Sequence, residues 1–213
     1  MTYIEYVDYQ LRTGEQAFEH HRPTLTRYGD GIEVLDFRAP NTGMYAVRIV
    51  FDNQCGSRLY ISGDLGYAVV VPTCDATLRD VAECFTSRRK NGTVFVDWDY
   101  FLEKVRASSD KYEYHHDAFK DDFIEMCRED DIEDDEAESF LDEHFEPWYG
   151  GVSFDSRNGA SLNDEARAAL SDMAPSFSAW LADCGRRVSA RVLLWLLAIR
   201  LSVEMLDKEG GAK

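Results

Sequence analysis

The sequence predicts an α+β protein, with an N-terminal antiparallel sheet of three or four strands and a mostly helical C-terminal half. Three observations support this fold class. Short segments rich in β-branched and aromatic residues, separated by turn-forming residues, follow one another between residues 31 and 71. Beyond residue 76, apolar residues recur at the three- and four-residue spacing of helices. This spacing continues through an acidic region, residues 112–146, which we expect to fold as a pair of helices.

The chain is expected to form a single domain. Its 213 residues, 45% of them hydrophobic and 13% aromatic, are enough to bury a core. Residues 1–75 would be mainly strands and residues 76–213 mainly helices. No internal repeat or low-complexity linker divides the sequence.

The first elements can be placed in order. Residues 2–18 are ambiguous between strand and helix, and Gly14 interrupts them. An antiparallel meander is then expected from Ile32–Phe37, Met44–Phe51, Arg58–Ser62 and Tyr67–Val71. Thr77 is a candidate N-cap for a helix that continues to about Ser87.

The later elements are mostly helical. Residues 93–96 would be a short extended piece, and Asp97 or Asp99 can cap a helix that runs through Val105. Three closing helices are expected near Ser161–Met173, Phe177–Asp183 and Val188–Leu206. The longest apolar run, Val192–Ile199, is far shorter than the roughly 18 residues of a membrane span, so we expect a buried helix there.

A concentration of negative charge distinguishes residues 117–146. Fifteen of these thirty residues are Asp or Glu, and with Lys120 and Arg128 their net charge is −13, out of −17 for the whole chain. Blocks of like charge are usually solvated or disordered. Here, however, one apolar helix face is expected from Tyr112, His116, Phe119, Phe123, Met126 and Cys127, and a second from Ala137, Phe140, Leu141 and Phe145. The two helices would join near residues 130–132.

The carboxylates would form a ridge beside the first apolar face. Residues four apart on a helix rise by about 6 Å, and duplex DNA carries one phosphate per roughly 3.4 Å of axis on each strand. A folded ridge of this density could occupy a basic groove built for phosphates. The predicted partner-binding residues are Glu113, Asp117, Asp121, Asp122, Glu125, Glu129, Asp130, Asp131, Glu133, Asp134, Asp135, Glu136, Glu138, Asp142, Glu143 and Trp148. The alternative is that this acidic face only keeps the protein in solution.

Charge and cysteine usage restrict the partners and the compartment. A net charge of −17 opposes direct binding to nucleic acid or to anionic membranes. Five scattered cysteines without a CxxC pair are typical of reduced thiols in the cytoplasm. Residues 2–11 have no continuous apolar run of the kind that a signal peptide needs.

Candidate catalytic residues are few, and each has a structural alternative. Asp64, between Gly63 and Gly66, could hold a metal or a phosphate, or could belong to a tight turn in which the glycines supply positive φ. Asp97 and Asp99 form a DxD sequence that could hold a divalent ion on a sugar-nucleotide, or could cap a helix.

Metal-ligating patterns are weaker still. The adjacent pairs His20-His21 and His115-His116 lack the spacing that zinc ligands usually have. Residues 131–142 are rich in oxygen ligands, but Glu136 occupies the position where a calcium loop has glycine. We therefore predict no metal, no cofactor and no catalytic residue. Two small basic clusters, residues 88–90 and 186–187, could pair with the acidic helices of the same chain or of a second copy.

Two segments resemble a group of uncharacterised proteins from bacteriophages and prophages. The first is GMYAVR, residues 43–48, and the second is LYISGDLGYAV, residues 59–69. They are similar to the pattern MYALR followed by ISGDxGxAIY in that group, and a looser likeness continues to about residue 105. The resemblance implies a gene product that acts inside a bacterial cell, and it supplies no catalytic residue. Among small acidic phage proteins, anti-CRISPR and anti-restriction inhibitors commonly imitate DNA.

The leading hypothesis is accordingly an inhibitor from a phage or mobile element, and not an enzyme. Its expected partner is a host nucleic-acid-binding protein, with a CRISPR effector as the expected target, and a homodimer is left open. Aromatic residues beside the carboxylates (Tyr112, Tyr114, Phe145, Trp148 and Tyr149) would add contact area. The other hypotheses are a metal-dependent enzyme that acts on a nucleotide or sugar-nucleotide through Asp64, Asp97 and Asp99, and a phage accessory protein whose acidic face is only solubilising.

Overall fold

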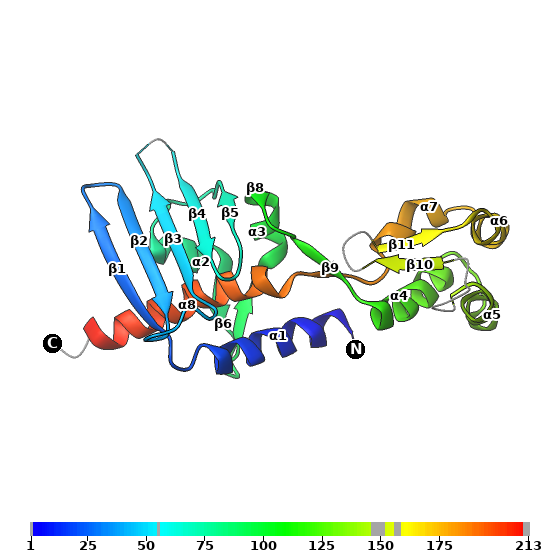
Figure 1. Cartoon of the computed structure of the whole chain (residues 1–213), viewed down its shortest axis with the longest axis horizontal. Helices are drawn as coiled ribbons and strands as arrows, with labels where there is room; N and C mark the ends of the chain where they lie inside the picture. The colour runs from blue at the N-terminus through cyan, green and yellow to red at the C-terminus, as the bar shows by residue number, and fades with distance from the viewer. Residues whose placement is uncertain (1, 55, 146–151, 156–158, 211–213) are drawn as a thin grey trace. The chain divides into compact units, whose positions relative to one another are not determined.

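The computed structural model describes residues 2–54, 56–145, 152–155 and 159–210. Its contacts separate the chain into two compact units (Figure 1). The sheet unit comprises Tyr3–Lys111 and Val188–Lys213, and the acidic unit comprises Tyr112–Arg187 with Met1–Thr2. Each unit has its own buried core, so each is described by itself. The expectation of a single domain stays a prediction, whereas the α+β fold class is confirmed.

The sheet unit is built on a six-stranded antiparallel sheet in the order β1-β2-β3-β4-β5-β8. Its strands are β1 (Arg22–Tyr28), β2 (Ile32–Arg38), β3 (Val47–Asp52), β4 (Arg58–Gly63), β5 (Ala68–Val70) and β8 (Val105–Ser108). The expected four-strand meander is confirmed as β2 to β5. The sequence analysis missed the two edge strands. β1 carries Pro23, which an edge strand tolerates because one side of it donates no ladder hydrogen bonds.

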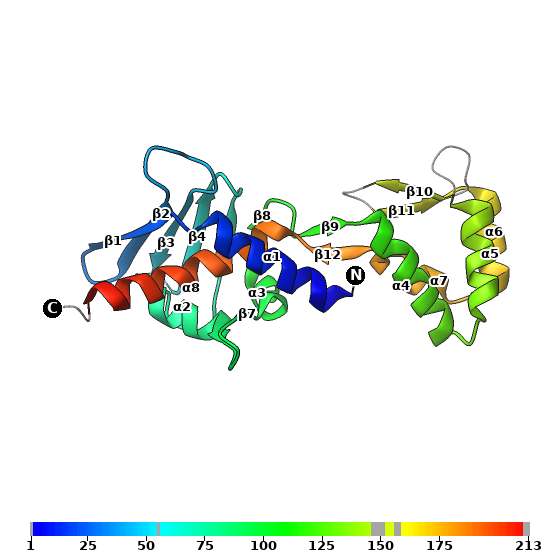
Figure 2. The ribbon, with the colours of Figure 1, turned by 90° about the horizontal axis from the view of Figure 1, so that it is seen from below.

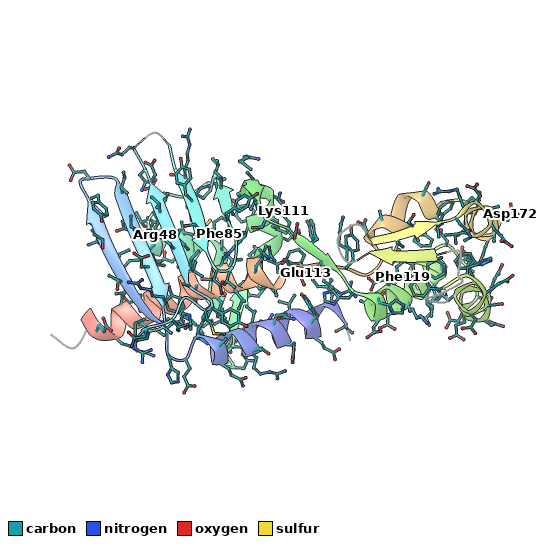
Figure 3. The ribbon with its side chains drawn as sticks, viewed as in Figure 1. Arg48, Phe85, Lys111, Glu113, Phe119 and Asp172 are labelled. Carbon is teal, nitrogen blue, oxygen red and sulfur yellow. The ribbon has the colours of Figure 1, made fainter. Side chains whose placement is uncertain are left out.

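One face of this sheet is buried and the other is open. Side chains alternate along a strand, and Leu35, Ile49 and Leu59 of neighbouring strands are fully buried on the inner face. Figure 2 shows helices α8 (Ala190–Gly210) and α2 (Leu78–Phe85) on one side of the sheet. The outer face carries Arg48 of β3, which is labelled in Figure 3.

Helix α8 forms the centre of the sheet unit. All eight residues of the apolar run Val192–Ile199 are buried in it, as the sequence predicted. No helix in the described part of the chain is long and apolar enough to cross a membrane. The ambiguous first stretch is helix α1 (Tyr3–Ala17). A Cβ atom on Gly14 of α1 would lie within 2.4 Å of Leu194 Cδ2, so the glycine permits the close approach of α1 to α8.

The remaining elements of the sheet unit agree with the predicted caps. Thr77 begins α2 by accepting a hydrogen bond from Asp80 N through its side chain. Asp97 caps α3 (Trp98–Lys104), and its carboxylate accepts a hydrogen bond from Tyr100 N at 3.1 Å. Strands β6 (Thr86–Arg88) and β7 (Val94–Val96) form a hairpin between these helices. The capping interpretation of Asp97 is therefore confirmed.

The acidic unit contains helices and short two-stranded sheets. Its elements are β9 (Tyr112–Tyr114), α4 (His116–Glu129), α5 (Asp134–His144), β10 (Val152–Asp155), β11 (Gly159–Leu162), α6 (Asp164–Met173), α7 (Phe177–Trp180), a 3-10 turn (Leu181–Asp183) and β12 (Arg186–Val188). The helix expected to begin near Ser161 begins at Asp164, because residues 159–162 pair with β10 instead. The sequence analysis predicted none of these four strands.

Candidate partner-binding surface

Helices α4 and α5 pack together through aromatic rings. The ring of Phe119 stacks on that of Phe145 with centroids 4.7 Å apart, and Phe123 stacks on Phe140 at 5.4 Å. Because Phe119, the earlier residue on α4, pairs with the C-cap of α5, and Phe123 pairs with the earlier Phe140, the two helices run antiparallel. Phe119, labelled on α4 in Figure 3, is fully buried. The two amphipathic helices predicted from the sequence, joined at residues 130–133, are confirmed.

The opposite faces of these helices hold exposed carboxylates. We call this set the acidic surface: Asp117, Asp121, Glu125, Glu129, Asp131, Glu133, Asp135, Glu136, Glu138, Asp142 and Glu143, every one of them exposed. On α4, four of them succeed one another at intervals of four residues, from Asp117 to Glu129, with a rise of about 6 Å per step. The acidic first turn of α5 also suits the positive end of the helix dipole.

Asp122, which the sequence grouped with the partner-binding residues, has an internal role. Its Oδ2 accepts hydrogen bonds from Gly185 N and from Arg187 Nη1, both at 2.7 Å, and its Oδ1 accepts one from Arg187 Nη2 at 2.8 Å. The Arg187 side chain is only 5% exposed. The pair therefore ties α4 to β12 inside the acidic unit. This interaction also realises the expected pairing of one basic cluster with an acidic helix.

Two further carboxylates bond within the unit while staying exposed. Asp130 accepts hydrogen bonds from Ser176 Oγ and, at 3.1 Å, from Trp180 Nε1. Asp134 accepts two from Arg128, at 2.5 and 2.6 Å. The hydrogen bonds from Arg128 lower the pKa of Asp134 below its usual value. The Arg128–Asp134 pair spans the turn between α4 and α5, and Asp130 ties that turn to α7, so both carboxylates are less suited to a partner than their neighbours.

The start of the first acidic helix was predicted too early. Tyr112 and Glu113 lie in β9, which pairs with β12, and α4 begins only at His116. The Arg186 guanidinium lies over the Tyr112 ring at 4.7 Å, a cation–π contact that holds this strand pair together. Glu113 is consequently not part of the helical ridge, which begins at Asp117.

The expected aromatic contacts are only partly in place. Phe145 is 4% exposed and belongs to the core of the acidic unit, so the prediction that it contacts a partner is wrong. Tyr112 and Tyr114 are half-buried in β9. Trp148 and Tyr149 lie outside the described residues. Of the three described aromatic residues, Phe145 thus serves the core of the acidic unit, and neither tyrosine is fully exposed.

Two of the three alternative catalytic residues, Asp64 and Asp97, have structural roles, and Asp99 lies in the first turn of α3. Asp64 Oδ2 accepts a hydrogen bond from Tyr45 N at 2.8 Å, beside Gly63 and Gly66 at φ of 130° and 94°. This is the turn geometry that the sequence analysis weighed against a ligand site. Asp97 caps α3. Across the described residues, no group of three or more His, Cys, Asp or Glu side chains could hold a metal ion.

The segments that carry the phage-protein resemblance are neighbours in the sheet. Residues 43–48 lead into β3 and residues 59–69 form β4 and enter β5. Val47 pairs with Gly63 and Arg48 with Ser62. A Cβ atom on Gly63 would lie 2.2 Å from Ala46 O, so the backbone there requires glycine. The SGD sequence thus has a local structural explanation at the end of β4, where the chain turns towards β5.

The four described cysteines are free thiols. Burial raises the pKa of Cys127 to about 11 and that of Cys184 to about 12. Thiols with such a pKa are poor nucleophiles at neutral pH. Neither of these cysteines is therefore a catalytic candidate.

With this geometry established, the chain was compared with known proteins. No protein-family model, curated protein or solved structure matches it.

Proposed function

We propose that this protein is an inhibitor from a phage or mobile element that binds a nucleic-acid-binding protein of the host's defence system. A CRISPR effector is the class of target that we propose. The acidic surface would occupy the basic channel of that protein and so exclude its DNA or guide RNA. The observation that carries the proposal is the folded, exposed array of carboxylates on α4 and α5, set on a hydrophobic core.

The arrangement supports mimicry because the charges are held in place. Phe119, Phe123, Phe140 and Leu141 anchor the two helices from below, and each is at most 6% exposed. The carboxylates above them therefore have a fixed spacing, as phosphates on a nucleic-acid backbone do. A partner with a basic groove would not have to order a flexible chain in order to bind them.

The surface also carries an energetic cost that solubility does not require. Like charges three or four residues apart on a helix destabilise it by a few tenths of a kcal/mol per pair. Glu125 and Glu129 form one such pair, and Glu138 and Asp142 another. Placing so many carboxylates on one helical hairpin is more easily understood if a cationic partner neutralises them.

The direct test is capture of a host protein by two matched variants. The acidic-surface variant carries Glu125→Lys, Glu129→Lys, Glu138→Lys and Asp142→Lys. The control variant carries Asp75→Lys, Glu83→Lys, Asp110→Lys and Glu209→Lys, all at exposed positions of the sheet unit. Both variants change the net charge by the same amount, so general electrostatic attraction affects them alike.

We expect the wild-type chain and the control variant to retain one nucleic-acid-binding protein from a lysate of host cells. The acidic-surface variant should lose it, and the circular dichroism spectrum should be unchanged in both variants. Retention should weaken steeply as salt is raised, as electrostatic association does. Equal retention by both variants would exclude the acidic surface as the contact.

A further inference from the structure

A cleft on the sheet unit brings together two arginines that pair with no carboxylate among the described residues. Arg22 of β1 and Arg38 of β2 stand directly opposite each other in the β1–β2 register. With Thr24 and the loop 39–43, they line a cleft of about 650 Å³. Arg38 follows the buried Phe37, and because side chains alternate along a strand, it lies on the outer face of the sheet.

The same β1–β2 hairpin also contains an arginine whose charge is paired with a carboxylate. At its other end, Arg27 stands opposite Glu33, and Arg27 Nε donates to Glu33 Oε1 at 2.8 Å. The Arg22–Arg38 position has two like charges instead, and like charges directly opposite each other destabilise a strand pair. Among the described residues, no Asp or Glu lines the cleft. Asp36, on the same face, pairs with Arg48 at 3.5 Å.

Arg22 is held in position by neutral groups. Its Nη1 donates to His21 O at 2.7 Å and to Glu19 O at 3.1 Å. These carbonyl oxygens orient the guanidinium and leave its positive charge uncompensated. Within the described parts of the chain, neither Arg22 nor Arg38 forms an ion pair with a carboxylate. The cleft therefore contains two positively charged guanidinium groups. That of Arg22 is held in place by its hydrogen bonds to backbone carbonyl oxygens.

The other polar groups of the cleft can donate hydrogen bonds. Thr42 Oγ1 accepts from Met44 N at 3.1 Å, which leaves its hydroxyl hydrogen for another acceptor. Thr24 and Asn41 add a second hydroxyl and a side-chain amide. Guanidinium forks beside hydroxyl donors match the oxygen atoms of a phosphate group. The volume lies within the range of small-molecule sites and leaves room for an organic part beside the phosphate.

We propose that the Arg22–Arg38 cleft binds a phosphate-bearing small molecule, with both guanidiniums on the phosphate oxygens. The bound anion offsets the repulsion between the two arginines. This site lies in the sheet unit and does not depend on the function proposed for the acidic surface. A polynucleotide is disfavoured as its ligand, because the whole chain carries a charge of −17.

Calorimetric titration of the full chain with pyrophosphate, in buffer of physiological salt, tests the proposal. We expect saturable binding to the wild-type protein and at least a tenfold loss in Arg38→Gln. The control is Arg58→Gln, which removes one positive charge from another exposed strand position; its affinity should stay within twofold of wild type. Arg38→Lys should be intermediate, because lysine keeps the charge and loses the two-pronged hydrogen bonding.

Three results would overturn this proposal. If the wild-type chain showed no saturable binding of pyrophosphate, the cleft would not be a phosphate-binding site. An equal loss of pyrophosphate affinity in Arg38→Gln and Arg58→Gln would show that the anion is attracted by the general positive charge and not bound at this cleft. If a short single-stranded oligonucleotide bound more tightly than pyrophosphate, the ligand of the cleft would be a polynucleotide and not a small molecule. The acidic-surface variant should bind pyrophosphate as the wild type does, which separates this test from that of the proposed function.

Discussion

The two units of the chain differ sharply in charge. The acidic unit contains 21 acidic and 6 basic residues, a net charge of −15, whereas the sheet unit contains 19 and 17, a net charge of −2. The sheet unit therefore resembles an ordinary globular surface with both signs interspersed. Nearly all of the protein's negative charge belongs to the unit that carries the acidic surface.

The two units also use their carboxylates differently. In the sheet unit, Glu204 accepts hydrogen bonds from Arg88 at 2.7 and 2.8 Å and from Arg200 at 2.8 Å, and Asp8 pairs with Arg89 at 3.1 Å. In the acidic unit, Asp122 and a few others make such bonds, while most carboxylates face solvent. Carboxylates that pair with arginines stabilise the fold, whereas exposed carboxylates on the acidic surface can contact a partner. The following predictions test that distinction.

The largest effect is expected where the acidic unit uses a carboxylate internally. Asp122→Ala removes the carboxylate that accepts two hydrogen bonds from the buried Arg187 guanidinium, and should destabilise the acidic unit by roughly 3–5 kcal/mol. Glu125→Ala, three residues along the same helix, should change stability by less than about 0.5 kcal/mol. Hydrogen exchange of α4 and β12 peptides in increasing urea measures both. Similar effects of the two substitutions would contradict the internal role of Asp122.

A smaller effect is expected in the sheet unit on acidification. His21 is 2% exposed, and burial lowers its pKa below the ordinary value of 6.5. The unfolded chain then binds a proton more readily than the folded chain. The contribution of neutral His21 to the free energy of unfolding is therefore complete above about pH 6.5. It decreases as the pH falls from there towards the pKa of His21 in the folded state.

Variants of the two adjacent histidines make this test specific. The urea midpoint of the sheet unit should fall between pH 7.5 and 5.5 in the wild type and in His20→Gln, whose histidine is exposed. In His21→Gln the midpoint should be lower overall and should change less over this interval. A wild-type midpoint that is constant over the same pH interval would show that His21 does not titrate as described.

The smallest effect is expected from salt. Screening weakens the repulsion among the carboxylates of the acidic surface, so added NaCl should stabilise the acidic unit by a few tenths of a kcal/mol. The sheet unit, whose positive and negative charges nearly balance, should gain nothing or lose slightly. Hydrogen exchange of peptides from α5 and α8 at low and high salt reports on the two units separately. If salt changed the stability of both units equally, the acidic unit would not be destabilised by repulsion among its carboxylates more than the sheet unit is.

Much of the fold could be predicted from local sequence patterns. Strands β2 to β5 were predicted because β-branched residues and turns alternate there, and Thr77 and Asp97 were recognised as helix caps. The run Val192–Ile199 was predicted to be a buried helix because it is apolar and too short to span a membrane. In each case the signal lies within about ten neighbouring residues, which is the range over which periodicity and capping act.

The missed features depend on distant partners. Tyr112 fits the helical spacing of α4, but β12, more than seventy residues further along the chain, pairs with it as a strand. Asp122 looks like its neighbour Asp121 in sequence, and only the fold brings Arg187 to it. The basic pair at residues 186–187 was the one available signal. The Arg22–Arg38 cleft was missed because β1 was not recognised as a strand.

The most direct test of the proposed function is a competition titration with the captured host protein. Its affinity for its own guide RNA or target DNA would be measured by fluorescence anisotropy while the chain is added. We predict that the wild type and the control variant displace the nucleic acid and that the acidic-surface variant does not. Simultaneous binding of chain and nucleic acid, or displacement by the acidic-surface variant as efficient as by the wild type, would contradict mimicry.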